Sequence, residues 1–383
     1  MKVIGVCFVS TRDAGLSQQG NSWPLIRNWY REAGLKLIKV QLPRWATTDP
    51  RDVLDAIEDG CRAIVLCTAT REDRLGEGYD PNWIWHALSR PAGSGLRYLD
   101  VIEAARQRGA TVLLEIGNEP DLEGIDPVVA SRLTVEAIRF LRPRLPGVRF
   151  LASMPTLSRY YDSFLSDALV AAVDGIATHV YVYRSLFAEV PTDQHEWSRI
   201  WQRLMRDSRV REVWVTEVGV NDKAVPYEEK AAECYRWLQA TPEKVKGAAW
   251  FTIGLPGRWP REWDGYCLHK REHLLALAGK RGDTVQQPPV GSRIFRETGY
   301  WIAGEIRSFW EDLERRGLAL PLIGFPISEP FTMVLDGKTR EVQLFERCAL
   351  VVEPENQPPW RVHPVLGRHF LEIWKAKGGE RWN

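Results

Sequence analysis

Several patterns that define common classes of protein are missing from this sequence of 383 residues. Its six cysteines form no C-x-x-C pair and show no Cys/His spacing typical of a metal site, so we expect neither a disulfide framework nor a bound metal. No apolar run reaches ~18 residues, the length needed to span a membrane. The net charge of +1 gives no electrostatic basis for binding nucleic acid or an anionic membrane.

The sequence also lacks the glycine-rich signatures of nucleotide binding. No G-x-G-x-x-G and no P-loop follows any of its β-rich runs, and no cofactor is indicated. A signal peptide is not recognisable, because Met1 is followed directly by a β-rich run that ends at Val9. This start is consistent with a cytoplasmic protein and with a secreted one whose signal has been removed.

Tryptophan, by contrast, is abundant, with 17 residues in the chain. Many of them fall in predicted loops: Trp45, Trp83, Trp85, Trp259 and Trp263. Loop tryptophans beyond the needs of a core favour the binding of flat apolar ligands such as the faces of sugars. A hydrophobic fraction of 44% is sufficient for a large core, and the chain length predicts two domains.

The first ~280 residues alternate β-rich runs with amphipathic helical patterns, which is typical of parallel βα units. We predict eight strands, at 3–9, 36–42, 62–68, 111–117, 148–153, 175–183, 213–218 and 247–253. The helical patterns between them cover 22–33, 52–58, 97–108, 127–141, 196–207 and 227–239. Eight such units match a (β/α)8 TIM barrel, an α/β fold in which functional residues collect at the carboxyl ends of the strands. A doubly wound open sheet is the alternative fold.

Two connections between a strand and the next helix are longer than usual. Residues 69–95 carry Trp83, and residues 254–268 carry Trp259 and Trp263. Long loops in a compact domain are usually functional or disordered, and the aromatic content of these two argues against disorder. We expect them to form the walls of a cleft above the barrel mouth. The alternative is that their aromatic residues only anchor the loops.

Two of the predicted strands deliver a glutamate at or near their carboxyl ends. The run TVLLEIGNEP at 111–120 stops at Asn118, Glu119 and Pro120, and the run EVWVTEVGV at 212–220 carries Glu217. Two carboxylates that flank one bond are what glycoside hydrolysis requires, one as acid/base and one as nucleophile or base. The alternative for Glu119 is a capping role, since Asn-Glu-Pro-Asp is also a sound turn sequence.

Other strand ends carry polar or aromatic residues as well: Arg44 and Trp45 after strand two, His179 and Tyr181 in strand six, and Trp250 in strand eight. Together with the two glutamates, this arrangement resembles the retaining glycoside hydrolases of clan A. These are cellulase-like (β/α)8 barrels with catalytic glutamates on strands four and seven. The resemblance covers roughly the first 270 residues.

The resemblance implies a role for each matching residue. Glu119 would be the acid/base, Glu217 the nucleophile, and Asn118 a donor to the sugar 2-hydroxyl. Arg44 and Tyr181 would hydrogen-bond the nucleophile. The remaining predicted substrate contacts are the polar wall His179, the platform Trp250, and the loop residues Trp45, Trp83 and Trp259. The sequence departs from many members of the family at 66–70, where it offers no histidine after strand three.

The chain changes character at 282–292, a polar segment rich in Pro and Gly that predicts a linker. Residues 293–383 would form a small α+β module, with a helix at 293–316 and a hairpin around Asp336 and Gly337. The segment 306–329, which contains IGFP, resembles the LGFP-type repeats of bacterial cell-surface proteins. This resemblance implies contact with cell-wall glycan. The alternative is an accessory domain packed on the barrel.

The sequence therefore predicts a two-domain enzyme. Its barrel, at 1–281, would hydrolyse β-linked oligo- or polysaccharides with retention of configuration. One alternative is a catalytically silent glycan-binding protein with the same cleft. Another is a transglycosylase, which would share the catalytic residues and differ only in the access of water.

Overall fold

The computed structural model describes residues 2–8, 10–11, 14–17, 21–42, 48–68, 76–258, 260–280, 289, 291–295, 300–328, 330–357, 359–366 and 370–373. Contacts divide the chain into two compact units, residues 1–283 and 284–383. The predicted linker at 282–292 lies largely outside the described residues.

The first unit contains a closed barrel of eight parallel strands in chain order. The strands are β1 (Val3–Phe8), β2 (Leu37–Gln41), β3 (Ala63–Cys67), β4 (Thr111–Ile116), β5 (Arg149–Ser153), β6 (Gly175–Val182), β7 (Val213–Val220) and β8 (Val245–Phe251). Strand β8 pairs with β1 and closes the barrel. The predicted (β/α)8 fold is confirmed, and the open-sheet alternative is wrong.

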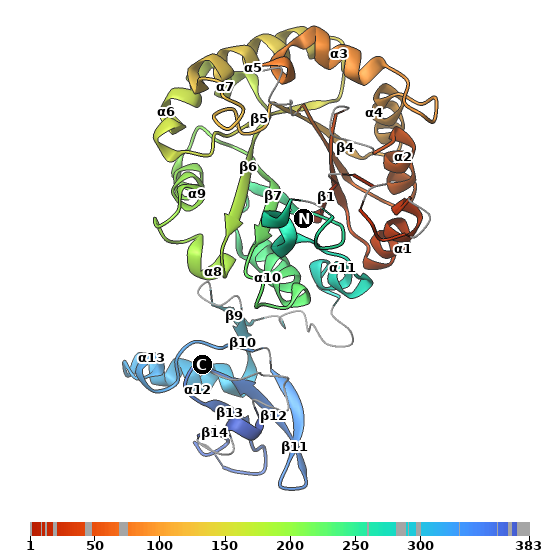
Figure 1. Ribbon diagram of the computed structural model, residues 1–383. Coiled ribbons are helices and arrows are strands. Elements are labelled where there is room, and N and C mark those ends of the chain that lie inside the picture. Colours follow the sequence, from red (N-terminus) through yellow and green to blue (C-terminus); the bar gives the residue numbers. More distant parts are fainter. Residues whose placement is uncertain are drawn as a thin grey trace. The chain divides into compact units, whose positions relative to one another are not determined.

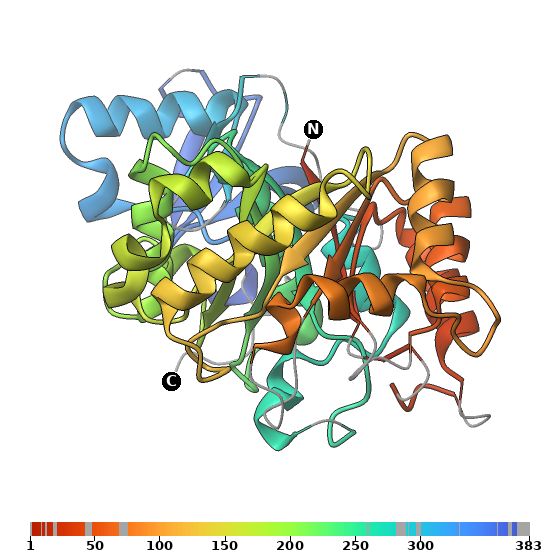
Figure 2. The same cartoon turned by 90° about the horizontal axis from the view of Figure 1, so that it is seen from above.

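Helices surround these strands (Figures 1 and 2). They are α1 (Trp23–Ala33), α2 (Pro50–Glu58), α3 (Pro81–Ser89), α4 (Tyr98–Gln107), α5 (Pro127–Leu141), α6 (Tyr161–Phe164), α7 (Asp167–Ala172), α8 (Leu186–Glu189), α9 (Glu196–Arg206), α10 (Tyr227–Ala240) and α11 (Arg271–Leu277). Short 3-10 turns cover Glu77–Tyr79, Ser158–Tyr160 and Arg261–Tyr266. Asp-Pro pairs begin α2, α3 and α5, where the carboxylates of Asp49, Asp80 and Asp126 accept the first backbone N–H groups.

Side chains on the strands alternate between two buried layers. One layer lies between the strands and the helices, and the other fills the barrel interior. The interior layer includes Leu37, Leu113 and Ala177. Because alternate residues of a strand share a face, Lys39, Glu115 and His179 point into the barrel as well, two residues nearer the mouth. The strand period thus gathers three ionisable side chains at one end of the barrel.

Strand β7 departs from this alternation at Thr216. His179 pairs directly with Glu217, and the register between β6 and β7 shifts so that Thr216 is skipped. A β-bulge of this kind re-aims the side chains beside it. Thr216 and Glu217 both face the interior, where Thr216 Oγ1 donates to Glu115 Oε1 over 3.0 Å.

The first predicted cleft wall differs from the expectation. Residues 69–75 lie outside the described residues, and residues 81–89 form helix α3 because Asp80 and Pro81 provide a helix start. Trp83 and Trp85 lie on this helix and pack against the layer between strands and helices. The prediction that they belong to a loop above the mouth is wrong.

The second unit is a small α+β module. It contains β9 (Arg293–Ile294), β10 (Trp301–Ile302), α12 (Gly304–Arg315), α13 (Ala319–Leu322) and an antiparallel sheet of β11 (Phe331–Leu335), β12 (Lys338–Leu344), β13 (Ala349–Val352) and β14 (Val362–Val365). The predicted hairpin is present, with Asp336 and Gly337 both in the left-handed region at φ 50° and 74°. The helix begins at Gly304, later than the predicted residue 293.

All six cysteines are buried free thiols. None of the described helices combines the length and the apolar composition that a membrane crossing requires.

Candidate active site

A tight turn after β4 positions Glu119. Gly117 and Glu119 both have left-handed backbones, with φ 74° and 48°. The Glu119 peptide N–H donates to Ser153 Oγ over 3.3 Å, and its carbonyl accepts the N–H of Leu122 over 2.9 Å. A non-glycine residue in this region is strained by ~1–2 kcal/mol, so its surroundings must hold it there.

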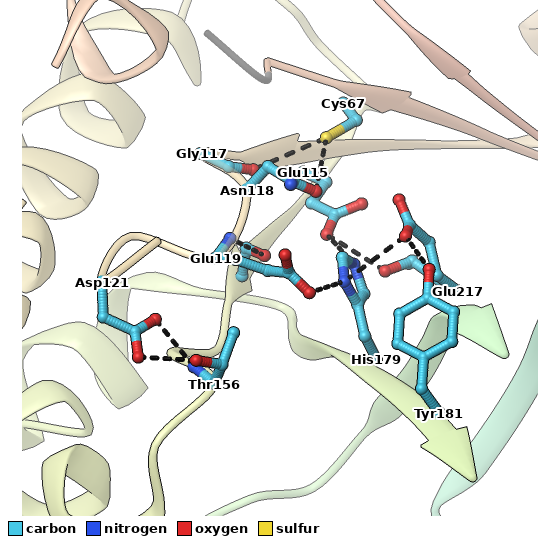
Figure 3. Close-up of polar contacts among 12 residues, drawn as sticks. Cys67, Glu115, Gly117, Asn118, Glu119, Asp121, Thr156, His179, Tyr181 and Glu217 are labelled. Carbon is cyan, nitrogen blue, oxygen red and sulfur yellow. Dashed lines mark hydrogen bonds and ion pairs between the residues drawn. The ribbon is translucent and has the colours of Figure 1, made fainter. Parts of the chain in front are cut away.

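Two side chains provide that support. Thr68, directly after β3, accepts the Gly117 N–H through Oγ1 over 2.7 Å and donates to Gly78 O over 2.6 Å. Asp121 accepts hydrogen bonds from Thr156 N, Thr156 Oγ1 and Leu157 N over 2.8, 2.8 and 3.1 Å (Figure 3). The Glu119 turn is therefore fixed to the ends of β3 and β5.

Five ionisable side chains from β2, β4, β6 and β7 or their ends meet inside the barrel mouth. Figure 3 shows Glu115, Glu119, His179 and Glu217. Lys39 Nζ lies 2.9 Å from Glu217 Oε1, 3.1 Å from Glu115 Oε2 and 3.3 Å from His179 Nε2. His179 Nδ1 lies 2.6 Å from Glu119 Oε1 and 3.6 Å from Glu217 Oε2. We call Lys39, Glu115, Glu119, His179 and Glu217 the mouth cluster.

Burial and mutual contacts set the ionisation of the mouth cluster. Burial opposes the charge on Glu115, but Lys39 and His179 outweigh it and hold the pKa of Glu115 at about 2. Burial and the nearby Lys39 both lower the pKa of His179. The carboxylates around it, Glu217, Glu119 and Glu115, have the larger effect and raise this pKa to about 9. The pKa of Glu217 is lowered against its burial by His179, Lys39 and Tyr181. At neutral pH, Glu217 is ionised between two cations.

Aromatic side chains line the same end of the barrel. Tyr181 Oη donates a hydrogen bond to Glu217 Oε2. The Tyr181 ring contacts Phe251, Tyr266 and Trp197 with centroid distances of 5.8, 5.2 and 5.7 Å. Trp197, in the first turn of α9, also stacks on His179 at 6.1 Å. Burial and the adjacent Glu217 raise the pKa of Tyr181, so its hydroxyl remains a donor.

The structure brings together only part of the predicted site. The site includes Glu119, Glu217, His179 and Tyr181, which meet as described. The Cys67 thiol donates a hydrogen bond to Asn118 Oδ1 over 3.8 Å, so the amide NH2 of Asn118 points away from Cys67. The predicted contacts Arg44, Trp45 and Trp259 lie outside the described residues. Trp83 packs elsewhere, on α3.

Trp250 is not a sugar platform. Its side chain is 0% exposed, and Nε1 donates to Tyr266 O over 2.7 Å. Strand alternation explains the error, because Ala249 and Phe251 face the barrel interior and Trp250 faces the helices. The interior position at this end of β8 belongs to Phe251.

A family model and several solved structures are similar to parts of this chain. Residues 92–264 match the family described as glycosyl hydrolase catalytic core. The matched residues lie within the first unit, residues 1–283. No curated protein sequence matches the chain.

Solved structures resemble the chain in fold. A family 39 glycoside hydrolase from the gut symbiont Bacteroides cellulosilyticus WH2 is similar over 95% of this chain and 79% of its own, with 14% identity and a TM-score of 0.52. A β-mannanase from the blue mussel Mytilus edulis covers 74% of this chain and 93% of its own, with 13% identity and a TM-score of 0.44. An endo-β-1,4-glucanase from Xanthomonas axonopodis pv. citri is similar over 73% of this chain and 99% of its own, with 13% identity and a TM-score of 0.42.

Sequence reasoning missed three residues at the barrel mouth: Lys39, Glu115 and Trp197. A signal for the first two exists, because Lys39 is a lone cation in an apolar strand and Glu115 a lone anion in another. Charges are almost never fully buried unless they are paired, so two such strands predict a buried ion pair. Trp197 is the second residue of α9 and carries no comparable signal.

Replacing Gly117 by Ala should displace the Glu119 turn. A Cβ at this position would lie 2.1 Å from Tyr79 Oη, and the left-handed φ adds strain. We expect a loss of ~2 kcal/mol or more in the free energy of unfolding, measured by denaturant titration. Gly109→Ala is the matched control, because Gly109 also has φ 68° but its Cβ would meet nothing within 4 Å. Equal losses in the two variants would show that the Tyr79 contact is unimportant.

The mouth cluster should make stability depend on pH in both directions. The pKa of Glu115 is lowered from 4.5 to about 2, so its contribution of about 3 kcal/mol is present above pH 4.5 and lost as pH falls toward 2. The pKa of His179 is raised from 6.5 to about 9, so its contribution is full below pH 6.5 and lost as pH rises through 9.

Denaturant titrations at several pH values test this expectation. The difference in the free energy of unfolding between wild type and Glu115→Gln should shrink from pH 5 to pH 2. A difference that stays constant over that range would mean that Glu115 is not held ionised by Lys39.

Proposed function

We propose that the barrel is a retaining β-glycoside hydrolase, with Glu217 as nucleophile and Glu119 as acid/base. The observation that carries the proposal is the position of both carboxylates around one atom, since His179 Nδ1 lies 2.6 Å from Glu119 and 3.6 Å from Glu217. The two oxygens are thus no farther apart than the sum of these distances. Retaining enzymes place their two carboxyl groups ~5–5.5 Å apart and inverting enzymes ~6.5–9.5 Å apart, so the contact of both carboxylates with one nitrogen supports retention.

The environment of Glu217 suits a nucleophile. Lys39, His179 and the Tyr181 hydroxyl lower the pKa of Glu217 despite its burial, so the nucleophile is present as an anion. It would attack the anomeric carbon while Glu119 gives its proton to the leaving oxygen, which breaks the glycosidic bond and leaves a glycosyl ester on Glu217. Glu119 would then take a proton from water as that water attacks the anomeric carbon, which breaks the bond between this carbon and the Glu217 oxygen and releases the Glu217 carboxylate.

The environment of Glu119 suits an acid/base. Its Oε1 faces His179, which leaves Oε2 to carry the transferable proton. Asn118, beside Glu119 on the same turn, is the proposed donor to the sugar 2-hydroxyl.

The test is a substrate panel of β-glucans, mannans, xylans and aryl β-glycosides. We expect wild type to hydrolyse at least one β-linked substrate, with the β-anomer of the product appearing first in NMR spectra, and Glu217→Gln to be inactive. First appearance of the α-anomer would refute retention. Binding without cleavage would favour the silent glycan-binding protein, and longer glycosides as main products would favour the transglycosylase.

The second unit, with the barrel boundary near 281 and the module at 293–383, is proposed as an accessory module that contacts cell-wall or other glycan. Trp360, 71% exposed on this unit, is the observation that favours a glycan contact. Trp360→Ala should reduce retention of the whole protein on insoluble polysaccharide and leave hydrolysis of aryl glycosides intact. Unchanged retention would contradict the module's role.

A further inference from the structure

The 3-10 turn at 261–266 places an aromatic ring against the hydrogen-bond donor of Glu217. The turn ends in Tyr266, whose ring centroid lies 5.2 Å from that of Tyr181. Tyr181 donates a hydrogen bond to Glu217. The Tyr266 ring also packs on Gly219, where a Cβ would lie 2.5 Å from Cδ1 of Tyr266. This ring therefore supports both the hydroxyl donor and the strand that carries Glu217.

Side chains of the barrel hold this turn by its backbone. Three successive carbonyls of the turn each accept a hydrogen bond from a side chain of α10 or β8. The pairs are Tyr227 Oη to Asp264 O over 2.7 Å, Lys230 Nζ to Gly265 O over 2.9 Å, and Trp250 Nε1 to Tyr266 O over 2.7 Å. We call these three hydrogen bonds the carbonyl clamp. Carbonyls at the end of a helical turn usually take partners from outside it, so the clamp fixes where the turn lies.

Lys230 contributes the only charged donor among the three pairs of the carbonyl clamp. Its side chain is 0% exposed, and Nζ lies 4.8 Å from the ring centroid of Tyr227. Burial lowers the pKa of Lys230 to about 8, with Lys223 acting in the same direction and Asp222 in the opposite one. Taking an ammonium out of water is costly, and the hydrogen bond and the ring contact offset that cost. Charge-assisted hydrogen bonds are roughly twice as strong as neutral ones, so Lys230 makes the strongest bond of the clamp.

The carbonyl clamp holds the turn against the strand of the nucleophile. A Cβ at Gly265 would lie 2.1 Å from Asn221 Oδ1, so the turn directly contacts the residue that follows β7. Glycines at 219 and 265 permit this close approach. Without the clamp, the turn could move away from β7 and take the Tyr266 ring away from Tyr181.

We propose that Lys230 is a positioning residue for the nucleophile, because it holds Tyr266 against Tyr181 and so keeps the Tyr181 hydroxyl on Glu217. This inference rests on the proposed function. Lys230 lies on α10 and acts only through the turn, without contact to the substrate. The Tyr181 hydroxyl lowers the pKa of Glu217, so a Tyr181 ring without this support should leave Glu217 with a higher pKa.

The test compares Lys230→Met with wild type on a β-glycoside that wild type hydrolyses. We expect Lys230→Met to lower kcat roughly tenfold with less effect on KM, and to move the acidic limb of the pH–activity profile ~0.5–1 unit to higher pH. Lys244→Met is the matched control, since Lys244 Nζ also donates to two backbone carbonyls, of Leu204 and Asp207, each over 2.9 Å. Lys244 lies at the opposite end of β8, so its loss should lower stability and leave the limb in place. An unmoved limb in Lys230→Met, or equal shifts in both variants, would overturn the proposal.

A second variant tests the same chain of contacts without disturbing the carbonyl clamp. Tyr266→Leu keeps the backbone carbonyls and removes only the ring, so it should move the acidic limb in the same direction even if Lys230→Met does not fold. A limb that stays in place in Tyr266→Leu would contradict the proposed role of the turn.

NMR spectra of protein with isotopically labelled tyrosine rings separate this proposal from the hydrolase. The Tyr181 signal, assigned by its loss in Tyr181→Phe, should shift in Lys230→Met and not in Lys244→Met. That result without any hydrolysis by wild type would support the positioning role and refute the proposed function. Hydrolysis by wild type with an unshifted Tyr181 signal in Lys230→Met would refute the positioning role alone.

Discussion

Glu119→Ala should hydrolyse ordinary glycans ~10²- to 10⁴-fold more slowly than wild type, yet still react with aryl glycosides whose leaving group needs no protonation. Without the acid, cleavage of an unactivated bond has no proton donor. With an activated phenol, Glu217 can still form the glycosyl ester, which then accumulates because no base activates water. A burst of phenol release followed by a slow steady state, measured by stopped flow, is the expected signature.

Added azide distinguishes the two glutamates. In Glu119→Ala it should attack the accumulated ester and give a β-glycosyl azide, whereas in Glu217→Ala it should occupy the space of the missing carboxylate and give the α-azide. The same azide anomer from both variants would contradict the assigned roles. The silent glycan-binding alternative predicts no azide adduct from either.

Lys39→Met should lower kcat/KM roughly 100- to 1,000-fold, although Lys39 is not expected to touch the substrate. Its ammonium contacts both Glu217 and Glu115, and all three side chains are at most 6% exposed. Removing one partner of a buried ion pair typically costs ~3–5 kcal/mol. Without this cation the pKa of Glu217 should rise, so the acidic limb of the pH–activity profile should move to higher pH.

A double variant separates positioning from folding. Lys39→Met/Glu115→Gln removes the anion that the single variant leaves unpaired, so it should be more stable than Lys39→Met. It should not recover activity, because Glu217 still lacks its cation. Recovery of both stability and activity would show that Lys39 serves only the fold.

The barrel could be predicted because its signals are local. Eight β-rich runs separated by helical patterns identify the fold without knowledge of any contact, and the Asp-Pro pairs mark helix starts in the sequence. The pair of glutamates was also accessible, because Glu119 follows the end of a strand and Glu217 lies in another. What these signals specify is the end of the barrel at which a residue lies.

The errors arise from side-chain direction. Trp250 was assigned to the sugar although its position in β8 faces the helices, a distinction that depends on which residues of the strand face inward. Glu217 faces inward only because of the β-bulge at Thr216, and no residue type in the sequence indicates this bulge. Lys39 was not predicted as a contact of Glu217, because its position in the middle of a strand does not show that its long side chain reaches the barrel mouth.

The central claim is that Glu217 forms a covalent bond with the sugar, and an adduct measured by mass spectrometry tests it most directly. Wild type would be incubated with an activated 2-deoxy-2-fluoro β-glycoside of the sugar that the substrate panel identifies. The fluorine slows both steps, and the activated leaving group restores the first. The account predicts a mass increase of one fluoroglycosyl group, located on Glu217 after proteolysis and absent from Glu217→Gln. An adduct on another residue, or substrate turnover without any adduct, would contradict it.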